Sequence, residues 1–280
     1  MMGHGLPWSC VVGVFLVSVG AALGHQDPMG DIHPNVSVVD GRFAVVFKTS
    51  VPDAQADYLE SKPVHRMIFE KDGSIFAPRH PLTRRRSHRE TGPVGLYGKA
   101  IRLGGSTLYF GETRGTPRSY VLRNKEGELS RVRLAWPDGV TLQLLEDVTA
   151  TDEGIAMTGK EDREILKFYW FAHDSVAELK VLTIGATACI YDFPVASNIT
   201  HAGGRYWVAY MRPDGEELKL SLWSWKPGDE KGRVEDLDSP TTWNSHLSMA
   251  AIGDRLCLAY HWADIYPGVA KIVTVFRKAE

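Results

Sequence analysis

Polar side chains that could bind a ligand recur along the chain, each at the start of a short apolar run. Asp147, Asn198 and His246 follow one another at intervals of roughly 50 residues, and Asn35 lies about twice as far before Asp147, with Gly98 between them. Amides, carboxylates and imidazoles can hydrogen-bond to sugar hydroxyls, and two carboxyl groups can together hydrolyse a glycosidic bond. The alternative is that these residue types simply cap turns where strands begin. Whether these residues bind a ligand or cap turns depends on the strands and turns in which they lie.

Those elements are copies of one repeat. Asn35 to Phe47 matches Asn198 to Tyr210 without a gap, and His246 to Tyr260 is a third copy with about two extra residues before its turn. Residues 98–110 and 147–159 are weaker copies. Each copy has a glycine-containing turn, where positive φ is permitted, followed by a run rich in Val, Tyr, Phe and Ala. This pattern predicts a β-hairpin.

Further strand-like runs follow each hairpin, for example Val64 to Lys71, Glu164 to Phe171 and Glu217 to Trp225. Three to four strands in every ~50 residues are typical of a propeller blade. We therefore predict an all-β protein, a five-bladed β-propeller of about 50-residue blades, in preference to a β-sandwich. In propellers the innermost strands begin at one end of the central channel, so the recurring polar residues should meet there.

The N-terminus predicts export. Residues 9–23 are nearly all apolar, and Ala22, Leu23 and Gly24 supply small residues for signal cleavage. We expect residues 1–24 to be a signal peptide and residues 25–280 a single propeller domain. The mature protein would be secreted or periplasmic, without a stable membrane anchor. The fifth blade lacks an outer strand in the sequence pattern, and the segment from Gln26 to His33 is a candidate to supply it.

Charge and cysteine usage set further limits. The formal net charge is −2, which argues against nucleic acid as a partner. One strong cationic cluster, Arg79 to Arg89, is either an anion site or a solvated loop. Cys189 and Cys257 remain after signal cleavage, and we expect them to be buried free thiols, although an exported protein could pair them.

Aromatic and acidic residues in the connecting loops are a second set of candidates. Asp192 precedes the fourth hairpin, Trp243 precedes the fifth, and Trp262 follows it. Flat aromatic faces beside polar groups suit sugar recognition. The same residues could equally belong to ordinary packing between blades.

The segment from Gly30 to Phe47, GDIHPNVSVVDGRFAVVF, resembles the opening of five-bladed propeller glycosidases of the arabinanase and β-xylosidase kind. The resemblance implies a hydrolase with a catalytic aspartate at the start of the first hairpin, but here Pro34 is followed by Asn35, which cannot act as a base. The remaining carboxyl groups near strand starts are Asp31, Glu146, Asp147 and Asp192. The repeat as a whole resembles exported bacterial propellers.

Taken together, the sequence predicts an exported propeller that binds a carbohydrate or cell-envelope glycan at one end of its channel without catalysis. The predicted ligand-binding residues are Asn35, Asp147, Asn198, His246, Asp192, Trp243 and Trp262. We expect no metal, no cofactor and a monomer. The alternatives are a glycoside hydrolase or lyase on the same fold, and a scaffold for protein interactions.

Overall fold

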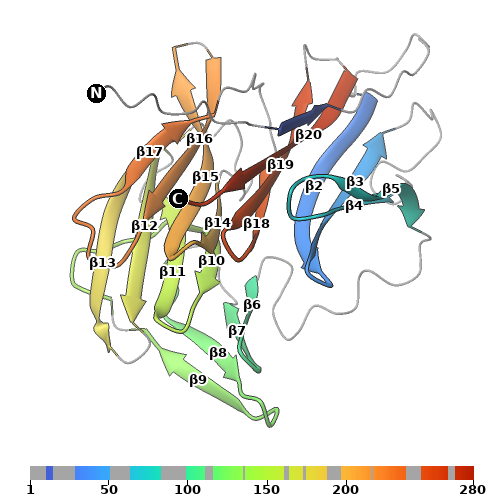
Figure 1. Cartoon of the computed structure of the whole chain (residues 1–280). Coiled ribbons are helices and arrows are strands. Elements are labelled where there is room, and N and C mark those ends of the chain that lie inside the picture. The colour runs from blue at the N-terminus through green and yellow to red at the C-terminus, as the bar shows by residue number, and fades with distance from the viewer. Residues whose placement is uncertain are drawn as a thin grey trace, which may run out of the picture.

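The computed structural model describes residues 11–14, 29–50, 64–82, 99–110, 116–134, 136–160, 164–172, 175–187, 197–215, 217–237, 247–263 and 269–280. Every regular element among these residues is a β-strand, and the strands form the five antiparallel blades of a β-propeller (Figure 1). The predicted fold class is therefore confirmed. In the part of the chain so described, no helix is long and apolar enough to cross a membrane.

Four of the blades contain four consecutive strands. Blade 1 comprises β2 (Met29–Val39), β3 (Arg42–Ser50), β4 (Val64–Phe69) and β5 (Ile75–Leu82). Blade 2 comprises β6 (Lys99–Leu103), β7 (Ser106–Phe110), β8 (Ser119–Arg123) and β9 (Leu129–Arg133). Blade 3 comprises β10 (Leu144–Ala150), β11 (Gly154–Lys160), β12 (Ile165–Ala172) and β13 (Ser175–Ala186). Blade 4 comprises β14 (Ser197–Ala202), β15 (Arg205–Asp214), β16 (Glu217–Trp225) and β17 (Arg233–Asp236).

Blade 5 is built differently. It has β18 (Leu247–Ile252), β19 (Arg255–Ala263) and β20 (Val269–Lys278), and its fourth position is taken by β1 (Val11–Val14), which pairs antiparallel with β20. The first residues of β2, Met29 and Gly30, pair in parallel with Val269 and Ala270 of β20. Of the described residues in the segment predicted to close the ring, Met29 and Gly30 thus reach blade 5, whereas Asp31 and Ile32 pair with β3.

The turns explain why the repeat folds as hairpins. In the first hairpin Asp40 and Gly41 have φ angles of 50° and 71°, and in the fourth Gly203 and Gly204 have 57° and 72°. Two consecutive positive φ angles are what a type I′ turn requires, and this turn matches the twist of the strands that it joins.

Within the described residues, four hydrophobic clusters fill the seams between blades 2 and 3, 3 and 4, 4 and 5, and 5 and 1. The aromatic run of β12 contributes as expected: Phe168 is fully buried between blades 3 and 4, with its ring centroid 4.9 Å from that of Trp223 and 5.3 Å from that of Trp225. No such cluster of described residues joins blades 1 and 2.

Candidate functional site

The hairpin register identifies the structurally equivalent positions at the start of the inner strands. Asn35 pairs with Val46, Asp147 with Thr158 and Asn198 with Ala209. In blade 5 the equivalent pair is Ser248 with Ala259, and in blade 2 it is Lys99 with Phe110. The sequence alignment had placed His246 and Gly98 at these positions. The fifth copy is offset because of the extra residues before its turn, and His246 and Gly98 lie outside the described residues.

These side chains bind to the neighbouring inner strand. Oδ2 of Asp147 accepts hydrogen bonds from Nδ2 of Asn198 at 2.6 Å and from the backbone N–H of Ile199 at 3.0 Å. Oδ1 of Asn198 in turn accepts the N–H of Met249 at 2.7 Å. This continuous chain of bonds joins the inner strands of blades 3, 4 and 5.

The same contact recurs once more, between blades 5 and 1. Oγ of Ser248 accepts the backbone N–H of Val36 at 2.9 Å. In all three seams the side chain at this repeat position accepts the N–H of the residue that follows the equivalent position in the next blade. A buried N–H needs such an acceptor, so these polar residues hold neighbouring blades together.

Asn35 differs from its equivalents. Its side chain is exposed, and among the described residues it has no hydrogen-bond partner. It belongs to blade 1 on the side of blade 2, the seam without a described hydrophobic cluster. Of the predicted ring residues that the structure describes, Asn35 is therefore the one able to meet a ligand without breaking a contact within the fold.

A second polar cluster lies buried beside the ring, between blades 3 and 4. Glu146 occupies a break in the register of β10 and is fully buried. Its carboxyl group lies 3.2 Å from Nζ of Lys160 and accepts a bond of 2.7 Å from the hydroxyl of Ser197, which is also 2.9 Å from Oγ1 of Thr158. Burial raises the pKa of Glu146 above its ordinary value, although the Lys160 charge and the Ser197 bond oppose this shift.

Glu146 and Asp147, the carboxyl groups near the strand starts whose side chains are described, therefore do not form an open pair. Asp147 accepts two bonds across the seam, and Glu146 has no exposed surface. Asp31 pairs through its backbone with Thr49, and Asp192 lies outside the described residues. A general acid or base must reach its substrate, and neither Glu146 nor Asp147 can do so in this arrangement.

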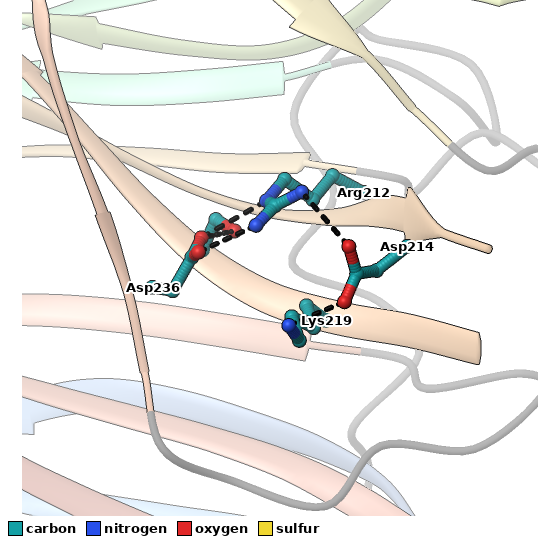
Figure 2. Close-up of polar contacts among 5 residues, drawn as sticks. Arg212, Asp214, Lys219 and Asp236 are labelled. Atoms are coloured by element: carbon teal, nitrogen blue, oxygen red, sulfur yellow. Dashed lines mark hydrogen bonds and ion pairs between the residues drawn. The ribbon is translucent and has the colours of Figure 1, made fainter.

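The hairpin of β15 and β16 extends past the start of β14, because the residues from Met211 onward have partners only on β16. Figure 2 shows the charged group on this extension. Arg212 donates to Asp236 through Nε at 2.9 Å and lies 3.8 Å from Asp214, which also pairs with Lys219. The bonds from Arg212 and Ser221 lower the pKa of Asp236 to about 2. Two cations and two anions satisfy one another here, so the group stiffens the hairpin.

The three loop candidates, Asp192, Trp243 and Trp262, are placed by the sequence in the connections before and after the fourth and fifth hairpins. Asp192 and Trp243 lie outside the described residues, and of Trp262 only the backbone is placed, opposite Lys271 in the pairing of β19 with β20. In the basic segment Arg79 donates to Oγ1 of Thr49 at 2.7 Å and lies over the ring of Phe47, while residues 83–98 lie outside the described part. Among the residues that are described, no group of three or more His, Cys, Asp or Glu side chains is arranged to hold a metal ion.

Sequence reasoning missed Ser248 and Lys160. Ser248 could have been found by counting back from the turn instead of aligning the apolar residues. Lys160 gave no signal, because a lysine at the end of a strand is ordinarily exposed. Its burial follows from the position of β14 against β10 and β11.

No protein-family model matches the chain, and a search of curated proteins finds no match. The solved structures that resemble it include the catalytic domain of a GH62 α-L-arabinofuranosidase from Coprinopsis cinerea, with 12% identity, a TM-score of 0.44, and 92% of this chain and 94% of that chain covered. A GH43_1 enzyme from Xanthomonas citri has 14% identity and a TM-score of 0.46, covering 88% and 87%. A GH62 hydrolase in complex with xylotriose has 13% identity and a TM-score of 0.44, covering 96% and 97%.

These are the kinds of propeller glycosidase that the first hairpin resembles. With TM-scores below 0.5, the likenesses carry no conclusion about the activity of this chain. Its activity therefore has to be inferred from the side chains of this chain.

Proposed function

We propose that the protein is an exported β-propeller that binds a carbohydrate or cell-envelope glycan, without catalysis, at the end of the channel where the inner strands begin. The mature form would comprise residues 25–280, would therefore lack β1 of blade 5, and would act as a secreted or periplasmic monomer.

The observation that carries this proposal is the contrast between Asn35 and two described carboxyl groups, that of Asp147 in the same ring and that of Glu146 beside it. Asn35 is exposed and can offer a donor and an acceptor to a sugar hydroxyl. Asp147 is bonded across the seam, and Glu146 is buried against Lys160. Hydrolysis needs two accessible carboxyl groups flanking the bond, whereas binding needs only converging polar and apolar groups.

A glycan array probed with the purified protein tests the proposal. Asn35→Ala should weaken binding to any bound glycan by about tenfold, since a lost hydrogen bond in a binding site costs about 1.5 kcal/mol. Glu230→Ala is the matched control, because Glu230 is exposed in the connection between β16 and β17, beyond the opposite ends of the strands. This variant should bind as the unmodified protein does.

The alternatives predict different results. Release of shorter products from xylotriose, the ligand of one GH62 neighbour, would overturn the non-catalytic reading and favour a hydrolase. Absence of binding to every glycan would favour a scaffold. Equal loss of glycan binding in Asn35→Ala and Glu230→Ala would show that the binding site is not at the start of the inner strands.

A further inference from the structure

One face of blade 2 carries four arginines in a compact arrangement. Thr107 of β7 lies opposite Arg102 of β6 on one side and Arg123 of β8 on the other, so these three residues form one row across the blade. Arg131 and Arg133 of β9 are opposite Val121 and Ser119 of β8, which point to the same side as Arg123. Their neighbours in sequence, Ile101, Leu122 and Val132, point to the other side and pack in the cluster shared with blade 3.

All four arginines are exposed, and none of their side chains has an ion pair or a hydrogen bond with another described residue. The described positions on the same face are Ala100, Arg102, Thr107, Tyr109, Ser119, Val121, Arg123, Leu129, Arg131 and Arg133. No aspartate or glutamate is among them. Since the whole chain has a net charge of −2, this cationic face is a local feature of blade 2.

Packing accounts for the other blades but not for this face. In a propeller the two faces of a blade pack against the neighbouring blades. Apolar clusters fill the seams between blades 2 and 3, 3 and 4, 4 and 5, and 5 and 1. On this face of blade 2 the four arginines are exposed, and the described residues form no apolar cluster over them. A core would not tolerate four unpaired arginines, because burial of an uncompensated charge is strongly unfavourable.

We propose that this face of blade 2 binds an acidic glycan, a chain of sugars bearing carboxylate groups, along the line from Arg102 to Arg133. Guanidinium groups bind carboxylates through two parallel hydrogen bonds and are preferred for planar anions. From strand geometry, backbone positions in the row of Arg102 and Arg123 are roughly 10 Å apart and those of Arg131 and Arg133 roughly 7 Å apart. Repeated negative charges on an extended polymer can meet several of them at once.

The choice of a glycan rests on the proposed function, and the composition of the face supports it over other polyanions. Single-stranded nucleic acids are held by exposed aromatic rings, and the aromatic residue here, Tyr109, is only 9% exposed. A membrane surface would be met by several exposed apolar side chains, and this face offers Leu129 alone among its described positions.

The test measures binding of the purified full chain to labelled polygalacturonate and to the same polymer with its carboxylates methyl-esterified. The variant Arg123→Glu, Arg131→Glu, Arg133→Glu should bind polygalacturonate at least roughly tenfold more weakly. The control Lys226→Glu, Lys231→Glu, Arg233→Glu makes the same change in net charge at exposed positions of blade 4 and should bind normally. Binding should weaken with salt, and the esterified polymer should not bind.

Three results would overturn the inference. Equal loss in both triple variants would show that only the net charge matters. Tighter binding to a single-stranded oligonucleotide or to anionic lipid vesicles, lost in the blade 2 variant, would assign the face to another partner. Unchanged binding in the blade 2 variant, with loss in Asn35→Ala, would move the anion site to the channel end. Conversely, if Asn35→Ala leaves polygalacturonate binding intact and the arginine variant abolishes it, the blade 2 site stands even though the proposed channel site fails.

Discussion

Asn198 should be a stability determinant, although it is a ligand candidate by sequence. The substitution Asn198→Ala removes the Nδ2 donor to Asp147 and leaves the N–H of Met249 without its acceptor. A hydrogen bond to a charged group contributes about 1.5–3 kcal/mol, and an orphaned buried donor costs about 1–3 kcal/mol. Because Asn198 is only half-buried, water can replace part of this loss. We expect a total cost of about 3 kcal/mol.

Urea unfolding followed by tryptophan fluorescence measures this cost, and calorimetry should show a melting temperature lower by roughly 5–10 °C. The matched control is Asn35→Ala, the same substitution at the same repeat position. Because the Asn35 side chain is exposed and unbonded among the described residues, its removal should change the free energy of unfolding by less than about 0.5 kcal/mol.

Two outcomes would refute this reasoning. If Asn198→Ala unfolds as the unmodified protein does, the bonds between inner strands do not stabilise the ring. If Asn35→Ala loses as much stability as Asn198→Ala, the two positions are equivalent in the fold, and Asn35 is not available to a ligand.

Three further predictions follow from the described contacts. Burial raises the pKa of Glu146, so the folded protein holds the proton of this carboxyl group more tightly than the unfolded chain does. The resulting contribution to the free energy of unfolding is complete below pH 4.5 and is lost as the pH rises through the raised pKa. Urea unfolding at a series of pH values should therefore show a slope above pH 4.5 that Glu146→Gln reduces, and an unchanged slope would contradict it. The thiol of Cys257 is free, fully buried and raised in pKa by burial, so a thiol reagent should react with it only after unfolding; rapid reaction in the native protein would disprove its burial. Deletion of residues 26–33 removes the pairing of Met29 and Gly30 with β20 and should lower the melting temperature relative to a chain lacking only residues 1–24, whereas equal melting temperatures would show that this closure is dispensable.

The amino-acid sequence by itself determined the blades. The glycine turns and the alternation of apolar residues are local properties, so the hairpins and the five repeats could be predicted without any knowledge of their neighbours. The burial of Phe168, Trp223 and Trp225 followed in the same way, because a long run of aromatic residues in a propeller strand has to be covered on both faces.

Only the tertiary structure decided which polar groups remain free. Asn35 and Asn198 are identical residues in matching copies of the repeat, yet Asn198 lies between Asp147 and Met249 and Asn35 is exposed. Alternation along a strand shows which side chains share a face, as for Arg131 and Arg133, but not which face meets another blade. Which face contacts another blade depends on how strands far apart in the chain pack together. The same packing decides which residues lie next to two otherwise identical side chains.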